Sequence, residues 1–248
     1  MKRNVSGHHS KDVMQTIANT INQTLETLVS VSTRKPKERP SPKPLPAETG
    51  KNSNGKRART PWQNKWIKLD CHCPKILELS DAAEAFCNRW YLNDPNPGLL
   101  VLAGAPNCGK THVVRAVFWW AQAVAFRAME DGAGEKPPRW TRVPSIAFYR
   151  WPEVTDGFKE GDYSPMTDLL DSDLVIIDDI GAEYDPSKNA ANRLCQTLSR
   201  REQKFTMVTT NIHPEHWAHL FDVRIADRLL RNSQIVDLFG VPSYAVAK

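Results

Sequence analysis

The sequence predicts an α/β fold in which a parallel β-sheet lies between helices. Three observations support this prediction. Short apolar runs alternate along the chain with segments of helical periodicity, which is the pattern of β-α-β units. The runs LLVLA at 99–103 and LVIID at 174–178 are bounded by turn-forming residues, as strands buried on both faces are. A glycine-containing loop directly follows the first run and leads into a helical segment.

The predicted elements alternate in order from residue 80 onward. Ser80 is the expected N-cap of the first helix, and the turn-forming stretch DPNPG at 94–98 separates that helix from the first strand. Because the strands are separated by helices, we expect them to be parallel. The expected helices are at about 80–92, 110–130, 152–159, 187–202, 214–220 and 222–230, and the expected strands at 99–103, 145–149, 174–177, 205–209 and 233–238.

The residues before 62 differ in composition from the rest and divide into two regions. Residues 1–32 contain an apolar stripe at helical spacing, which predicts an amphipathic helix that binds a partner. The alternative is a helix docked on the body of the same chain. Residues 33–61 are rich in Pro, Lys and Arg, and we expect a disordered linker. Residues 62–248 have the composition of a folded domain. The stripe consists of Val13, Met14, Ile17, Ile21, Leu25 and Leu28.

The positive charge is concentrated in the N-terminal quarter of the chain. The net charge is +5, yet the first 68 residues hold 14 Lys and Arg against 4 Asp and Glu, and the remaining 180 hold 19 against 24. A basic arm of this kind predicts a nucleic acid or an acidic partner. A solvated linker without a partner is the alternative interpretation.

The composition also predicts a cytoplasmic protein. The sequence contains no run of about 18 apolar residues, so it predicts no membrane span. The N-terminal MKRNVSGHHS lacks the apolar stretch of a secretory signal. The 5 cysteines are odd in number and scattered, which favours reduced thiols. Cys71-His72-Cys73 suggests zinc ligands, but the second pair that a closed zinc site needs does not follow downstream.

The loop after the first strand has the G-x-x-x-x-G-K-[ST] pattern of a P-loop. Its backbone N–H groups and the following helix N-terminus suit phosphate binding. Lys110 is expected to contact the β- and γ-phosphates, and Thr111 to bind Mg²⁺ through its hydroxyl. The pattern therefore predicts binding and hydrolysis of a nucleoside triphosphate, expected to be ATP, with Mg²⁺. The predicted nucleotide-binding residues are Gly104, Ala105, Pro106, Asn107, Cys108, Gly109, Lys110, Thr111 and His112.

A pair of carboxylates follows a second buried strand. Asp178 and Asp179 end the apolar run that begins at Leu174. Asp178 is expected to hold Mg²⁺ through water, since open α/β sheets bind ligands at the carboxyl ends of their strands. Asp179 is then the residue that polarises the attacking water. A simple polar turn is the alternative, but the P-loop, the acidic strand and Lys110 occur in the order that an ATPase requires.

Four segments together resemble the AAA+ ATPases of the DnaC/DnaI and IstB group. They are GKTH at 109–112, VIIDDIGAE at 175–183, the Thr209-Thr210-Asn211 end of the strand FTMVT, and Arg224-Ile-Ala-Asp-Arg228. The resemblance covers about residues 75–240. It implies an AAA+ core; with only 20 residues after Arg228, we expect no C-terminal lid domain. The P-loop departs from the group at Pro106-Asn107-Cys108, which bears on the rate of turnover rather than on binding.

The resemblance also implies catalytic roles. Asn211 matches the sensor position, where an amide orients the attacking water; a strand-end turn residue is the alternative. Arg224 matches an arginine finger that reaches into the site of a neighbouring subunit, so that ATP and DNA promote a homo-oligomer. Arg228 lies one helical turn later and either assists or pairs with Asp222 or Asp227 at the surface. Surface arginines without a catalytic role are the alternative for both.

The group contains helicase loaders and transposition ATPases. The resemblance therefore implies an ATP-dependent helicase loader that binds single-stranded DNA and a replicative helicase. The alternatives are an IstB-like transposition ATPase that acts on duplex DNA with a transposase, and a nucleotide-gated switch with little hydrolysis. Arginines beside aromatic side chains are candidate DNA contacts, although core packing also explains the aromatics. These candidates are Arg115, Phe118, Trp119, Trp120, Arg127, residues 139–142, Trp62 and Trp66.

Overall fold

The computed structural model describes residues 61–67, 69, 73–130, 140–185, 187–231 and 233–244. The predicted amphipathic helix, residues 33–60 of the predicted linker, Arg139 and the Cys71-His72 pair lie outside these residues, whereas Pro61, the last residue assigned to the linker, begins a helix. Within them, no helix is long and apolar enough to cross a membrane.

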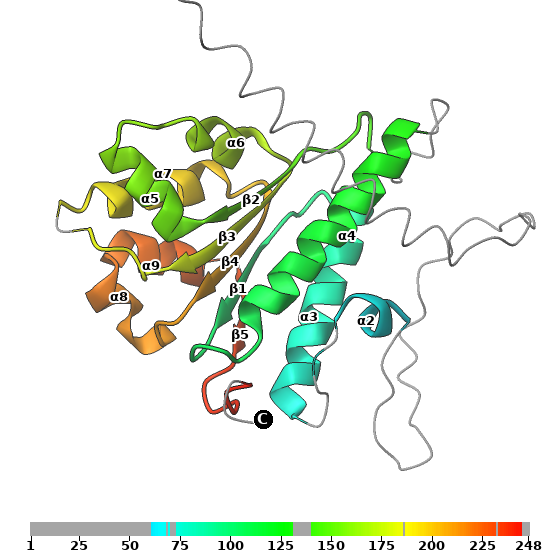
Figure 1. Ribbon diagram of the computed structural model, residues 1–248, viewed down its shortest axis with the longest axis horizontal. Coiled ribbons are helices and arrows are strands. Elements are labelled where there is room, and N and C mark those ends of the chain that lie inside the picture. The colour runs from blue at the N-terminus through cyan, green and yellow to red at the C-terminus, as the bar shows by residue number, and fades with distance from the viewer. Residues whose placement is uncertain are drawn as a thin grey trace, which may run out of the picture. The chain divides into compact units, whose positions relative to one another are not determined.

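A parallel sheet of five strands forms the centre of the fold (Figure 1). The strands lie in the order β2-β3-β4-β1-β5, and every neighbouring pair is parallel. This confirms the predicted fold class. Because β4 lies between β1 and β3, the strand that precedes the P-loop and the acidic strand both border it. The strands are β1 (Leu99–Ala103), β2 (Ile146–Arg150), β3 (Leu174–Ile180), β4 (Phe205–Thr210) and β5 (Ser233–Asp237).

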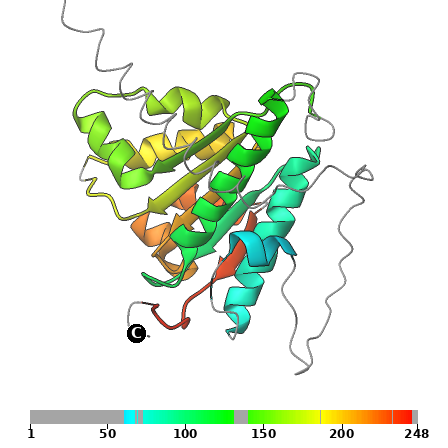
Figure 2. The same ribbon diagram turned by 45° about the vertical axis from the view of Figure 1, so that its right-hand side comes forward.

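Helices cover both faces of the sheet (Figures 1 and 2). In β1, Leu100 and Leu102 belong to the core cluster beneath α3 and α4, whereas Val101 and Ala103 belong to the cluster beneath α5, α7 and α9. This alternation is the period of two expected of a strand buried on both sides. The helices are α2 (Pro61–Trp66), α3 (Pro74–Tyr91), α4 (Lys110–Glu130), α5 (Trp151–Lys159), α6 (Pro165–Asp171), α7 (Asn189–Arg200), the 3₁₀ turn η1 (Pro214–His216), α8 (Trp217–Leu220) and α9 (Val223–Leu230).

The predicted elements are present, with differences at their ends. Ser80 is not an N-cap: α3 begins at Pro74, and the buried Ser80 hydroxyl donates to the carbonyl of Ile76 inside the helix. Proline is favoured in the first turn because its missing N–H has no partner there anyway. The short helices α2 and α6 were not predicted. In the part of the chain that is described, β5 is the last regular element.

Candidate nucleotide-binding site

The P-loop connects β1 to α4 and is fixed at its base by close packing. The N–H of Gly104 donates to the carbonyl of Thr210 on β4 (3.1 Å). A Cβ on Gly104 would lie 2.6 Å from the Cβ of Leu238, so only glycine fits there. Further along, Asn107 and Gly109 have φ of +61° and +100°. This backbone turns the loop around the N-terminus of α4, where the N–H groups of the first helical turn and the helix dipole favour an anion.

The buried Lys110 ammonium lies against the P-loop itself. Its Nζ donates to the carbonyls of Gly104 (2.7 Å) and Ala105 (2.8 Å) and to Oδ1 of Asn211 (2.8 Å). The Sγ of the buried Cys108 is 3.6 Å away. The carbonyl and amide partners are neutral, so anionic phosphate oxygens would be stronger acceptors for the same protons.

Asp178 is fully buried, and its two carboxylate oxygens differ. Oδ1 accepts from the hydroxyls of Thr209 (2.6 Å) and Thr111 (3.3 Å). Oδ2 has no hydrogen-bond partner in the structure. Burial raises the pKa of Asp178, and the negative charge of Asp179 raises it further. A buried carboxylate oxygen without a partner is costly. Mg²⁺ prefers carboxylate and hydroxyl oxygens, so Thr111 and Asp178 fit this cation.

Asp179 occupies an irregular position in β3. The pairing of β3 with β4 shifts between Ile177 and Ile180, and Asp179 has φ of +65°. Bulges of this kind re-aim a side chain at the end of a strand. The Asp179 N–H donates to the Thr209 hydroxyl (2.9 Å), and its Oδ1 accepts from Nδ2 of Asn211 (3.1 Å). Asn211 therefore bridges Lys110 and Asp179.

Three residues of this site had no assigned role in the sequence-based prediction. Thr209 bonds to both aspartates, and Arg150 places Nη2 3.7 Å from Oδ2 of Asp179. Glu183 accepts from the Gly181 N–H (2.7 Å) and from the Trp151 indole (3.2 Å), and burial raises its pKa. Gly181 has φ of +84°, and a Cβ there would lie 2.5 Å from Ile212. These contacts fix the loop that follows Asp179.

A cavity of about 780 Å³ brings most of the predicted site residues together. Its volume lies within the range typical of small-molecule sites. Of the remaining P-loop residues, Gly104, Ala105 and Cys108 contact Lys110, and Asp178 contacts Thr111. The cavity is lined by Leu69, Pro106, Asn107, Gly109, Lys110, Thr111, His112, Asp179, Asn211 and Tyr244.

The two predicted catalytic arginines lie on α9, and Arg224 lines a different cavity, next to α7. The Arg224 side chain is 60% exposed; its Nε donates to Asp222 (3.0 Å) and its Nη2 to Asn192 (3.0 Å). Arg228 donates to the Ser199 hydroxyl and to the Arg224 carbonyl. Of the two surface partners considered for Arg228, Asp222 bonds to Arg224, and Asp227 bonds to Arg231.

Most of the candidate DNA-contacting aromatics pack inside the protein. Trp120 contacts the rings of Trp62, Trp90 and Tyr91, and Phe118 contacts Phe148. The Trp140 indole donates to the carbonyl of Trp90, and Arg142 forms an ion pair with Asp173. Trp119 differs, because the residue is 55% exposed, and the exposed Arg115 lies one helical turn before it.

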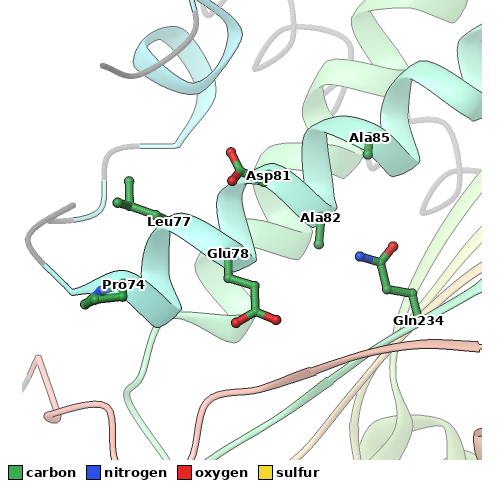
Figure 3. A pocket seen from close by; sticks show the side chains of 7 residues that line it. All are labelled: Pro74, Leu77, Glu78, Asp81, Ala82, Ala85 and Gln234. Carbon is green, nitrogen blue, oxygen red and sulfur yellow. The ribbon is translucent and has the colours of Figure 1, made fainter. Parts of the chain in front are cut away.

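A second cavity, of about 460 Å³, lies between α3 and β5 (Figure 3). Gln234 of β5 faces α3 across it, and Glu78 and Asp81 line it from the helix. Two carboxylates repel phosphate groups, and Asp81 already accepts from the Gln63 amide (2.7 Å). The phosphate-binding chemistry of the described residues therefore lies at the P-loop cavity.

The sheet order, the P-loop after β1 and the acidic end of β3 define an ATP-binding protein of the AAA+ type. The sequence profile of the IstB-like ATP binding protein family matches residues 93–244, which is more than half of the chain. The chain belongs to this family. The resemblance inferred from the four sequence segments is thereby confirmed. No curated protein sequence matches the chain.

Solved structures show the same fold at low sequence identity. DnaI is 20% identical with a TM-score of 0.52, over 71% of this chain and 87% of that chain. The DnaC helicase loader is 16% identical with a TM-score of 0.52, over 71% and 98%. AMPPCP-bound DnaA from Aquifex aeolicus is 13% identical with a TM-score of 0.50, over 68% and 48%. At these identities the likeness concerns the fold alone.

Proposed function

We propose that this protein is an ATPase of the helicase-loader kind, which hydrolyses ATP with Mg²⁺, binds single-stranded DNA and engages a replicative helicase. One observation carries the ATPase part of the proposal. Lys110 begins α4 after the P-loop, Asp179 lies near the end of β3, and Asn211 follows β4. Asn211 bonds to both of the others, and all three line a single cavity. A cation, a carboxylate and an orienting amide are the groups that phosphoryl transfer to water requires.

Each residue then has a distinct role. The P-loop N–H groups bind the phosphates, whose oxygens replace the carbonyls of Gly104 and Ala105 as acceptors for Lys110. Thr111 and Asp178 would hold Mg²⁺, which neutralises charge on the β- and γ-phosphates when bound. Asn211 orients the attacking water. Asp179 accepts its proton as the water oxygen bonds to the γ-phosphorus and the bond to the β–γ bridging oxygen breaks.

Arg224 completes the site of a neighbouring subunit in this proposal. Its exposed guanidinium is held by Asp222 and Asn192, two partners on its own surface that a phosphate can displace. A positive group at the transferring phosphate stabilises the transition state only when the subunits assemble. ATP therefore promotes a homo-oligomer. Arg228 supports this arrangement by donating to the carbonyl of Arg224.

The proposed DNA contact is the Arg115–Trp119 face of α4. An exposed indole one turn from a guanidinium suits base stacking combined with a phosphate contact. One of the solved proteins that share this fold is the DnaC helicase loader, and we extend that role to this chain. Partner binding is assigned to residues 1–32, joined by the linker at 33–61 to the ATPase domain at 62–248. The role implies a cytoplasmic location.

Transposition is the second candidate function. The match to the IstB-like family, which covers more than half of the chain, favours this second function. In that role the protein uses the same ATPase site but acts on duplex DNA together with a transposase. The two roles differ in the DNA that should stimulate hydrolysis, which provides the test.

The first experiment measures ATP hydrolysis by the purified protein alone, with single-stranded DNA and with duplex DNA. Greater stimulation by single strands than by duplex, lost in Lys110→Ala, supports the loader. Greater stimulation by duplex supports transposition. Binding of ATP without turnover under all conditions contradicts the ATPase and leaves a nucleotide switch.

A mixing experiment tests the arginine finger. Arg224→Ala should bind ATP normally and hydrolyse at least about a hundredfold more slowly, since arginine fingers contribute about 10³–10⁵ in rate. Mixing Arg224→Ala with Lys110→Ala should restore part of the activity. Arg231→Ala is the matched control, because Arg231 directly follows the same helix, is also 60% exposed and is ion-paired with Asp227. Absence of rescue in the mixture contradicts a site shared between subunits.

A further inference from the structure

The nucleotide cavity has apolar walls as well as polar ones. Asn211 bonds to both Lys110 and Asp179, and the three side chains form the polar part. Leu69 and Tyr244 also line the cavity, although they lie far from the P-loop in the sequence. Both side chains are half-buried and pack against the core cluster beneath α3 and α4. A group that fills the cavity therefore meets two apolar surfaces that the P-loop motif does not contain.

Leu69 lies directly against the P-loop. Its Cδ1 is 2.9 Å from the position that a Cβ on Gly109 would occupy. Gly109 also has φ of +100°, a backbone conformation that favours glycine. The absence of a side chain at Gly109 lets the leucine approach the loop backbone just before α4 begins.

Tyr244 reaches the same loop from the segment after β5. Its backbone N–H donates to the carbonyl of Asn107 (3.0 Å). Earlier in this segment, Leu238 packs against Gly104 and Val241 is buried, so the chain is fixed along the loop before it reaches Tyr244. Both views show this segment beside the loop that joins β1 to α4 (Figures 1 and 2).

We propose that Leu69 and Tyr244 bind the nucleobase of the nucleotide. The inference rests on the proposed function, because it assumes that the P-loop holds the phosphates. The base is the flat, weakly polar end of a nucleotide, and a tyrosine ring offers it a stacking surface. Leu69 adds an aliphatic contact. Because stacking and apolar contact grow with the area covered, the site favours purines over pyrimidines.

The test compares two ligands that share a diphosphate and differ in the base. Affinities for ADP and for inorganic pyrophosphate, both with Mg²⁺, are measured by calorimetry. Tyr244→Ala should weaken ADP binding about five- to a hundredfold, since a stacked base contributes about 1–3 kcal/mol. Pyrophosphate binding should stay unchanged, and Tyr244→Phe should bind ADP like the parent. Leu69→Ala should show a smaller loss with the same selectivity for ADP.

Tyr184→Ala is the matched control, because Tyr184 is highly exposed and lines a different cavity. Unchanged ADP affinity in Tyr244→Ala overturns the inference. So does an equal loss for both ligands, which would mean that Tyr244 only shapes the P-loop. If the parent protein binds neither ligand, the proposed function fails as well, and that result is distinct from a failure confined to Tyr244→Ala.

Discussion

The two ends of the parallel sheet each bury a charged side chain, and the two charges are stabilised to different extents. At the amino end, Arg201 follows α7 and is 2% exposed. At the carboxyl end, Asp178 is fully buried in β3. Both side chains are buried in the same domain, so the difference between Arg201 and Asp178 lies in their hydrogen bonds.

Every nitrogen of the Arg201 guanidinium donates at least one hydrogen bond. Nε donates to the Thr206 hydroxyl (2.9 Å), Nη1 to the carbonyls of Leu169 and Ser172, and Nη2 to that of Phe205. These partners come from α6, the start of β4 and the segment before β3. Burial lowers the pKa of Arg201 to about 10, so the side chain remains charged at neutral pH. The arginine therefore joins three segments of the fold.

Asp178, by contrast, has one oxygen with two hydroxyl donors and one oxygen with none. The difference indicates how buried charges should be interpreted. A buried charge whose hydrogen bonds are complete stabilises the fold. A buried charge with an unused oxygen beside a P-loop indicates a site that a ligand completes.

Arg201→Leu should produce the largest change in stability. It removes the guanidinium donors to the carbonyls of Leu169, Ser172 and Phe205, and each buried polar group left unsatisfied costs about 1–3 kcal/mol. The free energy of unfolding in urea should therefore fall by at least about 3 kcal/mol. Arg200→Leu is the control, because the neighbouring Arg200 is exposed and its loss should be small. Similar losses in the two variants would mean that the buried network is not important for stability.

Asp178→Asn should change stability in the opposite direction. The amide oxygen still accepts from Thr111 and Thr209, and the buried negative charge is removed. Without nucleotide and in EDTA, the variant should be about 1 kcal/mol more stable than the parent at pH 7. Binding of ATP with Mg²⁺ should weaken at least about tenfold, as expected for a residue that acts through a metal-bound water.

The pH dependence of that gain follows from the raised pKa. Asp178 binds its proton more tightly in the folded state, so its favourable contribution is complete below about pH 3.8 and is lost as the pH rises through the folded pKa. The advantage of the variant should therefore vanish as the pH falls toward 4. A variant that is less stable than the parent at pH 7 would contradict the claim that the carboxylate is held at a cost.

The sequence predicted the residues at the carboxyl end of the sheet, where the nucleotide site lies, better than those at the amino end, where Arg201 lies. The P-loop and the aspartates are local patterns, so their residues could be named before the strand order was known. Arg150 could not be named in this way, because it reaches the site only through the pairing of β2 with β3, in which it lies opposite Asp178. Leu69 and Tyr244 likewise reach the P-loop through tertiary packing alone.

Helical phase explains other differences. Trp119 and Trp120 are adjacent in sequence, yet the first is exposed and the second packs among aromatic rings. Both were candidate DNA contacts, since composition does not fix the rotation of a helix relative to the core. Ser80 resembled a cap because serine favours helix starts, but the same hydroxyl can donate to the carbonyl four residues earlier within a helix.

Arg142→Ala should have the smallest effect on the free energy of unfolding. It tests whether burial or the number of hydrogen bonds decides how much an arginine contributes to stability. Like Arg201, Arg142 lies at the amino end of the sheet, and it donates to both oxygens of Asp173 (2.7 Å each) and to the carbonyl of Val143. Its side chain is 59% exposed, however, so water replaces these partners readily. The free energy of unfolding should fall by less than about 1 kcal/mol.

The salt dependence gives a second measurement of the same difference. The effect of Arg142→Ala should shrink between low salt and about 1 M salt, where charges are screened within about 3 Å. The effect of Arg201→Leu should persist, because its partners are buried carbonyls that ions do not reach. If Arg142→Ala instead costs as much as Arg201→Leu at both salt concentrations, bond number rather than burial governs this end of the sheet. The contrast between Arg201 and Asp178 would then no longer separate structural from functional charges.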